Sequence, residues 1–243
     1  MNQVKQLISA LLDVFLPPVC HICRTFIPDS ETVHICPDCL VGLSRLSSPI
    51  CPKCGIPFSG AGEDHLCGSC LSFPPAFDRG RGAFLYEGAI RDLIHAFKYN
   101  QKIHLRYPLA MLTLQGISDF QKENELDIII PVPLHRKRLR QRGFNQAVLL
   151  GQIMSRVLSL PMLPDAMTRV RYTEPQVELS SSERRLNVKG AFSVKDGSSV
   201  AGKRILLLDD VMTTGSTMDE CSRELKKAGA ANVTAITIAR TPK

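Results

Sequence analysis

The sequence predicts an α/β fold, in which a largely parallel sheet flanked by helices follows a small cysteine-rich module. Eight of the nine cysteines lie within residues 20–70, and after residue 77 apolar segments of strand length alternate with amphipathic segments of helix length. The 243 residues suffice for a core domain of about 150 residues and a smaller unit. We expect an amphipathic helix over 1–19, a cysteine-rich module over 20–72 and an α/β domain over 77–243.

The spacing of apolar residues places the elements of the larger domain. It predicts strands over 79–86, 126–132, 204–208 and 233–239, and helices over 89–99, 143–160 and 216–228, with Gly229 ending the last helix. Strands that alternate with helices favour a parallel sheet that is buried on both faces. Such sheets bind ligands at the carboxyl ends of their strands.

The positive charge is concentrated in this larger domain. The formal net charge is +7, but residues 1–76 carry a balance of −2 and the remainder therefore +9. An anionic ligand or partner is thus expected in the C-terminal part. The mean hydropathy is +0.01, and no apolar run approaches the roughly 18 residues that a membrane-spanning helix needs.

Eight cysteines form four Cys-x-x-Cys pairs, which predict two structural zinc sites. Two thiols separated by two residues can hold one metal ion from a tight turn, and two such turns supply the four sulfur ligands that Zn²⁺ prefers. The pairs repeat with a period of 31 residues, which favours two consecutive zinc ribbons. A cross-braced arrangement, which joins the first pair with the third and the second with the fourth, fits the same spacing. The predicted ligands are Cys20, Cys23, Cys36, Cys39, Cys51, Cys54, Cys67 and Cys70.

The N-terminal segment has apolar residues at helical spacing from Val4 to Leu16, interrupted by Asp13 and ended by Pro17 and Pro18. Such a helix could dock on a membrane or a partner, or pack the zinc module onto the rest of the chain. No cleavage site of small residues follows it, which argues against a signal peptide. Because metal-free thiols persist in reducing surroundings, we expect a cytoplasmic protein, with peripheral contact at the inner face of the membrane as an alternative.

The most informative segment follows the buried strand over 204–208. A strand that ends in two carboxylates leads into a small, hydroxyl-rich turn and then into a helix N-terminus. The turn's amides and hydroxyls, together with the helix dipole, can bind one phosphate, and the carboxylates can accept hydrogen bonds from vicinal hydroxyls. This pattern predicts a site for a ribose 5-phosphate, while the Gly-Lys-Ser/Thr of a triphosphate loop is absent. The segment consists of Asp209, Asp210, Val211, Met212, Thr213, Thr214, Gly215, Ser216 and Thr217.

Five cations within seven residues follow the strand over 126–132. They could neutralise a pyrophosphate or, equally, a nucleic-acid backbone. A solvated basic helix start is the interpretation without a function. These residues are Arg136, Lys137, Arg138, Arg140 and Arg142.

The segment 209–217 resembles the loop that binds 5-phosphoribosyl 1-pyrophosphate (PRPP) in type I phosphoribosyltransferases. With the cysteine pairs and the run Arg142-Gly-Phe-Asn-Gln146, the chain resembles the ComF (GntX/ComFC-like) family from about residue 17 to residue 240. In that family a double zinc ribbon precedes a phosphoribosyltransferase domain. The resemblance therefore implies that 20–72 is the double zinc ribbon and 77–243 a type I phosphoribosyltransferase-like domain.

The resemblance also implies roles for individual residues. Asp209 and Asp210 should hold the ribose hydroxyls, residues 213–217 the 5-phosphate, and 169–192 should form a flexible loop from which Arg184 reaches the site. The catalytic candidates are Asp209, Asp210 and Arg184, with Mg²⁺ accompanying PRPP. Lys98 is a weaker candidate, since an exposed lysine at a helix end explains it equally well. The implied pyrophosphate loop consists of Val132, Pro133, Leu134, His135 and Arg136.

Two functions follow from the resemblance. The first is an enzyme that transfers phosphoribosyl groups from PRPP to an acceptor that the sequence does not identify, in DNA uptake, natural competence or the use of DNA as a nutrient. The second is a non-catalytic module of the DNA import machinery that binds single-stranded DNA or a nucleotide. The implied partners are PRPP or a related phosphoribosyl ligand, single-stranded DNA, a DNA-uptake helicase and recombination-mediator proteins.

Overall fold

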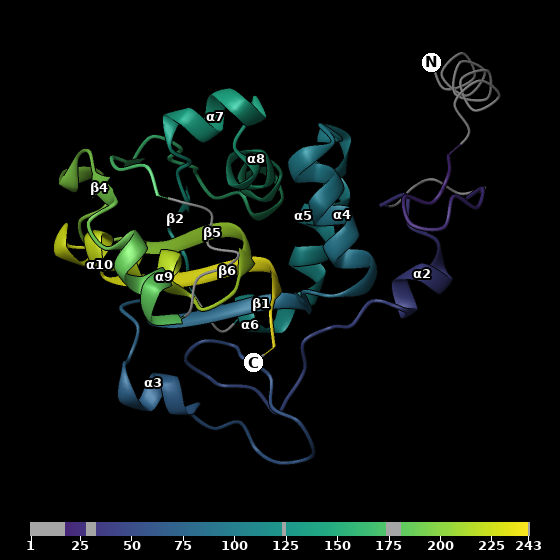
Figure 1. Cartoon of the computed structure of the whole chain (residues 1–243), viewed down its shortest axis with the longest axis horizontal. Coiled ribbons are helices and arrows are strands. Elements are labelled where there is room, and N and C mark those ends of the chain that lie inside the picture. Colours follow the sequence, from purple (N-terminus) through teal and green to yellow (C-terminus); the bar gives the residue numbers. More distant parts are fainter. Residues whose placement is uncertain (1–17, 28–32, 123–124, 174–180, 243) are drawn as a thin grey trace. The chain divides into compact units, whose positions relative to one another are not determined.

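The computed structural model describes residues 18–27, 33–122, 125–173 and 181–242 (Figure 1). The helix expected over 1–19 lies, except for its last two residues, outside this range. None of the helices within it is long and apolar enough to cross a membrane. The chain divides into two compact units, Met1–Leu43 and Ser44–Lys243, and each is described by itself.

The first unit carries the first two cysteine pairs and the short helix α2 (Pro37–Val41). Val19 and Phe26 form an isolated antiparallel bridge across the first pair. Among the described residues of this unit, the buried apolar side chains are those of Cys20, Ile27, Val33, Ile35, Cys36 and Leu43. A described core of this size buries little surface, and small units of this kind are commonly stabilised by a bound metal.

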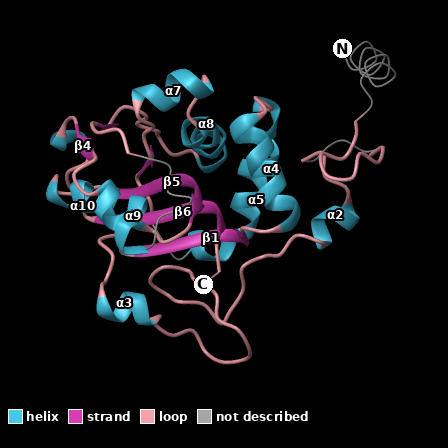
Figure 2. Ribbon diagram, in the orientation of Figure 1, coloured by secondary structure: helices cyan, strands magenta, loops and turns pink. Residues whose placement is uncertain are grey.

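The second unit is built on a four-stranded parallel sheet with the strand order β1-β6-β5-β2 (Figure 2). The strands are β1 (Arg79–Leu85), β2 (Ile128–Pro131), β5 (Arg204–Met212) and β6 (Asn232–Arg240). The two central strands, β5 and β6, are almost entirely buried because helices cover both faces of the sheet. The expected α/β class with a parallel sheet flanked by helices is confirmed.

One face of the sheet is covered by α5 (Arg106–Gly116) and α8 (Gln146–Leu158), with α4 (Gly88–Tyr99) beside them. Gly151 of α8 lies against the side chains of Leu208 and Ile129. The short elements η1 (Ile103–Leu105), α6 (Ser118–Lys122) and α7 (Arg136–Arg142) complete the connections between α4, α5, β2 and α8.

The other face is covered by α10 (Ser216–Lys227). Packed against α10 are α9 (Ser181–Val188) and a separate antiparallel hairpin of β3 (Met167–Arg169) and β4 (Phe192–Val194), followed by η3 (Gly197–Ser199). Ile205 and Leu207 of β5 share one buried cluster with Met218, Cys221 and Leu225 of α10. Residues of β5 thus alternate between the two faces, as in any buried strand.

The second pair of Cys-x-x-Cys turns, with helix α3 (Gly68–Ser72), belongs to this second unit. The Gly80 N–H of β1 donates a hydrogen bond to the Lys53 carbonyl (2.8 Å). Gly55 has φ +67°, and a Cβ there would lie 2.7 Å from the Gly80 carbonyl oxygen. Only glycine permits so close an approach, which holds the turn over 51–54 directly on the edge strand.

Two predicted elements differ from the observed ones. The strand expected over 204–208 continues to Met212, because β6 runs on to Arg240 and supplies hydrogen-bond partners for Asp209, Val211 and Met212. The helix expected over 143–160 begins later, at Gln146. Gly143 (φ 85°) ends α7, and the Asn145 side chain caps α8 by accepting from the Ala147 N–H.

Candidate functional site

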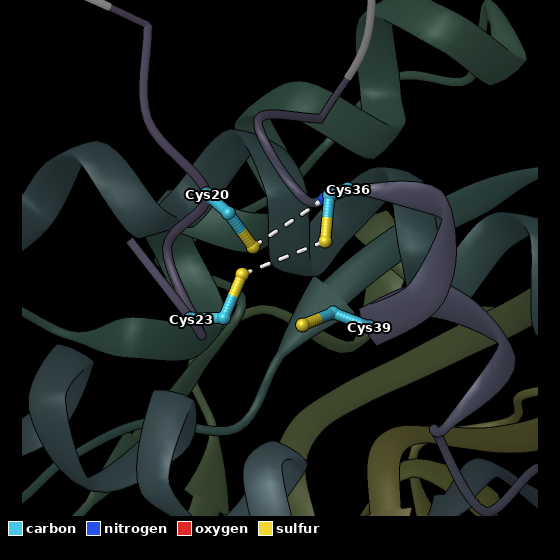
Figure 3. Close-up of side chains that lie close together, drawn as sticks. All are labelled: Cys20, Cys23, Cys36 and Cys39. Carbon is cyan, nitrogen blue, oxygen red and sulfur yellow. Dashed lines mark hydrogen bonds between the residues drawn. The ribbon is translucent and has the colours of Figure 1, made fainter. Parts of the chain in front are cut away.

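The first cysteine quartet is drawn in Figure 3. The sulfur atoms of Cys20, Cys23, Cys36 and Cys39 all lie within 4.8 Å of one another. The Cys36 N–H donates to Cys20 Sγ (3.4 Å), and hydrogen bonds with Thr25 lower the pKa of Cys23 to about 6. Backbone donors aimed at sulfur favour thiolates, which are the form that binds a metal.

The second quartet repeats this geometry 31 residues later. The sulfur atoms of Cys51, Cys54, Cys67 and Cys70 again lie within 4.8 Å of one another, and the Cys67 N–H donates to Cys51 Sγ (3.4 Å). The structure therefore gathers consecutive cysteine pairs, as the tandem alternative predicts, and not the cross-braced ones. Four convergent sulfurs in each quartet suit structural zinc, which prefers a tetrahedral set of thiolates.

The acidic pair lies at the carboxyl end of β5, beyond the end of β2, whose last residue Pro131 pairs with Leu208. Because successive side chains of a strand point to opposite faces, the two carboxylates have different neighbours. Asp210 Oδ1 lies 2.7 Å from Lys98 Nζ of α4. Asp209 accepts a hydrogen bond from the Asp210 N–H (2.9 Å), and the positive charge of Arg169 acts to lower its pKa.

These neighbours shift the acid–base properties of the pair. Burial, together with the charge of Asp210, raises the pKa of Asp209 to about 7, although Lys98 and Arg169 oppose the shift. Burial alone would lower the pKa of Lys98, but the Asp210 carboxylate outweighs it and the net shift is upward. Lys98 is therefore charged at neutral pH, whereas Asp209 is close to its titration point.

Lys98 was only a weak candidate from the sequence, but the structure places it at the acidic pair. Its side chain is only 16% exposed and does not extend into solvent from the end of α4. The sequence feature that could have predicted this is the position of Lys98 four residues after the buried Ile94. This spacing places the lysine next to the apolar face of an amphipathic helix. A cation at such a position needs a buried anion as its partner.

The hydroxyl-rich turn leads from Met212 into α10. Gly215 has φ +83° and is the residue before the first turn of the helix, where a left-handed conformation favours glycine. Thr214 Oγ1 and Ser216 Oγ are hydrogen-bonded at 2.8 Å, and the Ser216 N–H points to Thr214 Oγ1 (3.4 Å). The turn thus presents hydroxyls and the N-terminal amides of a twelve-residue helix at the end of the same strand that carries the acidic pair.

A pocket of about 300 Å³ adjoins this turn. Arg184 and Arg185 of α9 line it, so the structure brings the predicted Arg184 to the turn. Asp209 and Asp210 lie outside its walls. The lining also includes Thr213, Thr214, Gly215, Ser216, Asp219, Arg240 and the second-quartet cysteines Cys54, Cys67 and Cys70.

The segment predicted to bind pyrophosphate, from Val132 to Arg136, continues directly from β2. The Val132 N–H donates to the Leu208 carbonyl (2.9 Å), and Asn145 Nδ2 donates to the Val132 carbonyl (3.0 Å). His135 Nδ1 accepts from the Lys137 N–H (3.2 Å) and so caps α7. Asn145, within the run 142–146, therefore acts here as a support that fixes this segment beside the acidic end of β5.

The five predicted cations of α7 fall into two groups. Arg138 Nη2 donates to the Thr173 carbonyl (3.1 Å), Lys137 lies over the Tyr172 ring (4.6 Å), and Arg142 lies over the Tyr99 ring (5.1 Å). Arg136 and Arg140 are exposed, four residues apart on one face of α7, and pair with no residue in the described ranges. Of the five cations, only these two form no hydrogen bond or ring contact with another described residue.

The expected flexible loop over 169–192 begins and ends at residues that pair with each other, because Arg169 of β3 lies opposite Phe192 of β4. Arg169 is buried, donates to Thr173 Oγ1 and stacks on the Phe192 ring (5.0 Å). Residues 174–180 of this loop lie outside the described residues. The loop is thus anchored at its base by a short hairpin next to Asp209.

The Lys98–Asp210 contact makes a first prediction. Replacing Lys98 with Met leaves a nearly buried carboxylate without its cation, and the free energy of unfolding should fall by about 3 kcal/mol in urea titrations near pH 7. The matched double variant K98M/D210N removes both charges and should recover much of this loss. Equal destabilisation in the single and double variants would show that the loss in K98M does not come from an uncompensated Asp210 carboxylate.

Comparison with known proteins agrees with this architecture. Residues 11–71 match a double zinc ribbon domain, and residues 145–243 match a phosphoribosyl transferase domain. The chain is 36% identical over 230 residues to "DNA utilization protein YhgH" of Escherichia coli O157:H7, a match that covers 93% of this chain and 98% of the relative. It is 36% identical over 198 residues to "Competence protein F" of Haemophilus influenzae, covering 80% and 86%.

A more distant relative is "Competence protein ComFC" of Bacillus subtilis, at 27% identity over 223 residues, which cover 88% of this chain and 86% of the relative. Cysteine quartets, a parallel sheet with flanking helices and full-length relatives thus agree with the resemblance inferred from the motifs. The chain belongs to the ComF (GntX/ComFC-like) family, in which a double zinc ribbon precedes a phosphoribosyltransferase-like domain.

Proposed function

We propose that this protein binds PRPP, transfers its phosphoribosyl group, and acts in DNA uptake, natural competence or the use of DNA as a nutrient. One observation carries the proposal: the acidic end of β5 continues without interruption into a hydroxyl-rich turn at the N-terminus of α10. A phosphate site beside two carboxylates suits a phosphorylated ribose. The names of the relatives, which refer to competence and DNA utilization, support the connection with DNA.

Binding would use the turn and the acidic pair together. The 5-phosphate would accept hydrogen bonds from the amides and hydroxyls of 213–217, favoured by the positive end of the α10 dipole. The ribose hydroxyls would donate to the carboxylates of Asp209 and Asp210. Lys98 would hold the Asp210 carboxylate in one orientation through their 2.7 Å contact.

The chemistry would be electrostatic. As the bond between C1 and the pyrophosphate oxygen breaks, positive charge develops on the sugar and negative charge on the leaving group. The carboxylates at the end of β5 would stabilise the first, and Arg136 with the segment from Val132 to His135 would stabilise the second. Mg²⁺ bound with PRPP would add positive charge at the leaving group, and Asp209 and Asp210 are the oxygen donors that this site offers it. Arg184 would act from α9, beside the turn.

The proposal extends to organisation and surroundings. We assign 20–72 to the double zinc ribbon and 77–243 to the phosphoribosyltransferase-like domain, and infer a cytoplasmic location, with peripheral contact at the inner face of the membrane as the alternative. Single-stranded DNA, an uptake helicase and recombination-mediator proteins are the partners that the family resemblance implies for such a role.

Isothermal titration with PRPP and Mg²⁺ tests the ligand. The wild-type chain should bind, and the double variant D209N/D210N should bind at least about tenfold more weakly, because neutral amides accept hydrogen bonds less strongly than carboxylates. The variant D165N, at an exposed aspartate that pairs only loosely with Lys195, is the control and should bind like wild type. Absence of binding by the wild type, or undiminished binding by D209N/D210N, refutes the proposal.

The raised pKa of Asp209 predicts a pH dependence of binding. Only the ionised carboxylate accepts two hydroxyl hydrogen bonds, and with a pKa of about 7 its ionised fraction grows about tenfold between pH 6 and pH 8. Affinity should therefore increase with pH over this range and level off above it. The ligand phosphate also titrates near pH 6, so D209N, which retains only that dependence, provides the baseline. Identical profiles for wild type and D209N would contradict a role for this ionisation.

A second candidate function is a non-catalytic module that binds single-stranded DNA or a nucleotide. The observation that favours it is the pair Arg136 and Arg140, exposed on one face of α7. Two unengaged guanidinium groups at this spacing can contact adjacent phosphates of a flexible strand.

Fluorescence anisotropy with a single-stranded oligonucleotide across a salt series tests this candidate. The variant R136E/R140E should bind more weakly and lower the slope of log affinity against log salt by about 1.4, the value for two lost phosphate contacts. The control R106E/R156E makes the same change of charge at exposed arginines on α5 and α8 and should leave the slope nearly unchanged. Equal effects of the two double variants would reject a specific role of α7.

A further inference from the structure

The second cysteine quartet and the hydroxyl-rich turn over 213–217 line the same pocket. Cys54, Cys67 and Cys70 form part of its lining, and the residues from Thr213 to Ser216 form another part. All of them belong to the compact unit Ser44–Lys243, whereas the first quartet belongs to Met1–Leu43. The two quartets have the same local geometry, but only the second one shares its compact unit with the hydroxyl-rich turn.

Arg240 connects the quartet to the turn. It is the last residue of β6 and only 3% exposed, and its Nη2 donates to Cys54 Sγ (3.4 Å). Its backbone is paired with Met212, and the following N–H, of Thr241, donates to the Met212 carbonyl (3.1 Å). Met212 immediately precedes the turn. One residue thus reaches a metal ligand with its side chain and the base of the turn with its backbone.

The packing around Arg240 leaves this arrangement little freedom. A Cβ at Gly82 of β1 would lie 3.0 Å from Arg240 Cβ and 3.1 Å from the Arg240 nitrogen, so glycine makes room for the arginine. On the turn side, a Cβ at Gly215 would meet Met212 Sδ at 3.6 Å. Packing is therefore tight between Gly82 of the edge strand and Arg240, and the Met212 side chain lies beside Gly215 of the turn. We expect a displacement of Arg240 to shift the turn.

The charge of Arg240 requires a partner that the quartet can supply. Its Nε and Nη1 are buried and form no hydrogen bond, and no described carboxylate forms an ion pair with it. A buried guanidinium without an anion is costly. Four thiolates around Zn²⁺ carry a net charge of −2, so the zinc-loaded quartet would be the anion that compensates Arg240.

We propose that zinc in the second quartet, acting through Arg240, positions the turn over 213–217 and thereby controls binding of the phosphoribosyl ligand, and that zinc in the first quartet does not. Arg240 is a positioning residue, because it acts on the turn through its backbone pairing with Met212. The identity of the ligand rests on the proposed function, but the coupling between the quartet and the turn does not.

The 31-residue repeat of the cysteines allows the same substitution to be made at equivalent positions of the two quartets. Cys36→Ser and Cys67→Ser change equivalent positions of the two quartets, and metal analysis of the full chain should show that each loses one of two zinc ions. Hydrogen exchange of the amides of 213–217, measured without ligand, should be at least about tenfold faster in Cys67→Ser and unchanged in Cys36→Ser. PRPP affinity should fall by a similar factor only in Cys67→Ser. Equal effects of the two variants, or no effect of Cys67→Ser, would overturn the proposal.

Variants of Arg240 separate positioning from simple loss of the metal site. R240M should keep two zinc ions and the wild-type far-UV circular dichroism, yet exchange the turn amides faster and bind PRPP more weakly, while R240K, which keeps the charge, should recover part of both. If R240M matches the wild type in both measurements, or R240K is as impaired as R240M, the proposal fails. If Cys67→Ser does not fold, this pair of variants decides alone.

The two kinds of failure are distinguishable. If the wild-type chain does not bind PRPP, the proposed ligand is wrong, but the exchange rates of the ligand-free turn still test the coupling. If the wild type binds PRPP and the exchange rates do not respond to loss of the second zinc or of Arg240, the coupling is wrong and the proposed ligand stands.

Discussion

The pairing of the two central strands is the constraint on which the rest of this structure depends. β5 and β6 remain hydrogen-bonded up to Met212 and Arg240, several residues past the point where β2 ends. This extension holds the two aspartates in strand conformation at the carboxyl end of β5. It also fixes the residue at which the following turn begins. Without the partner strand, so polar a segment would gain little from remaining extended.

Strand geometry also separates the chemistry of the two aspartates. Asp210 lies on the side of α4, where Lys98 compensates its charge, and Asp209 lies on the side of α10, where burial and its neighbour disfavour ionisation. Adjacent carboxylates thus have different charged neighbours although their sequence context is nearly identical. Asp210 is held by an ion pair, and Asp209 titrates near neutral pH.

The sequence predicted what depends on local spacing. The cysteine turns are local motifs, and apolar periodicity located the strands of the parallel sheet and helices α4, α8 and α10 to within a few residues. It did not predict α5, α9 or the β3–β4 hairpin. The predicted length of β5 was too short. Carboxylates and threonines favour a turn unless another strand supplies hydrogen-bond partners, and the partner strand β6 is more than twenty residues distant in sequence. The roles of Lys98 and Arg240 depend on contacts across 112 and 186 residues, which no local pattern encodes.

The burial of the two quartets has a consequence for their reactivity. All four cysteines of the second quartet are buried, whereas Cys23 of the first is exposed and Cys39 is partly so. Oxidants react with thiolates that they can reach, and chelators remove metal ions from accessible sites, so the first quartet would be damaged or lose its metal before the second. Under such stress the chain would pass through a half-loaded form, in which the metal of the second quartet is the last to leave.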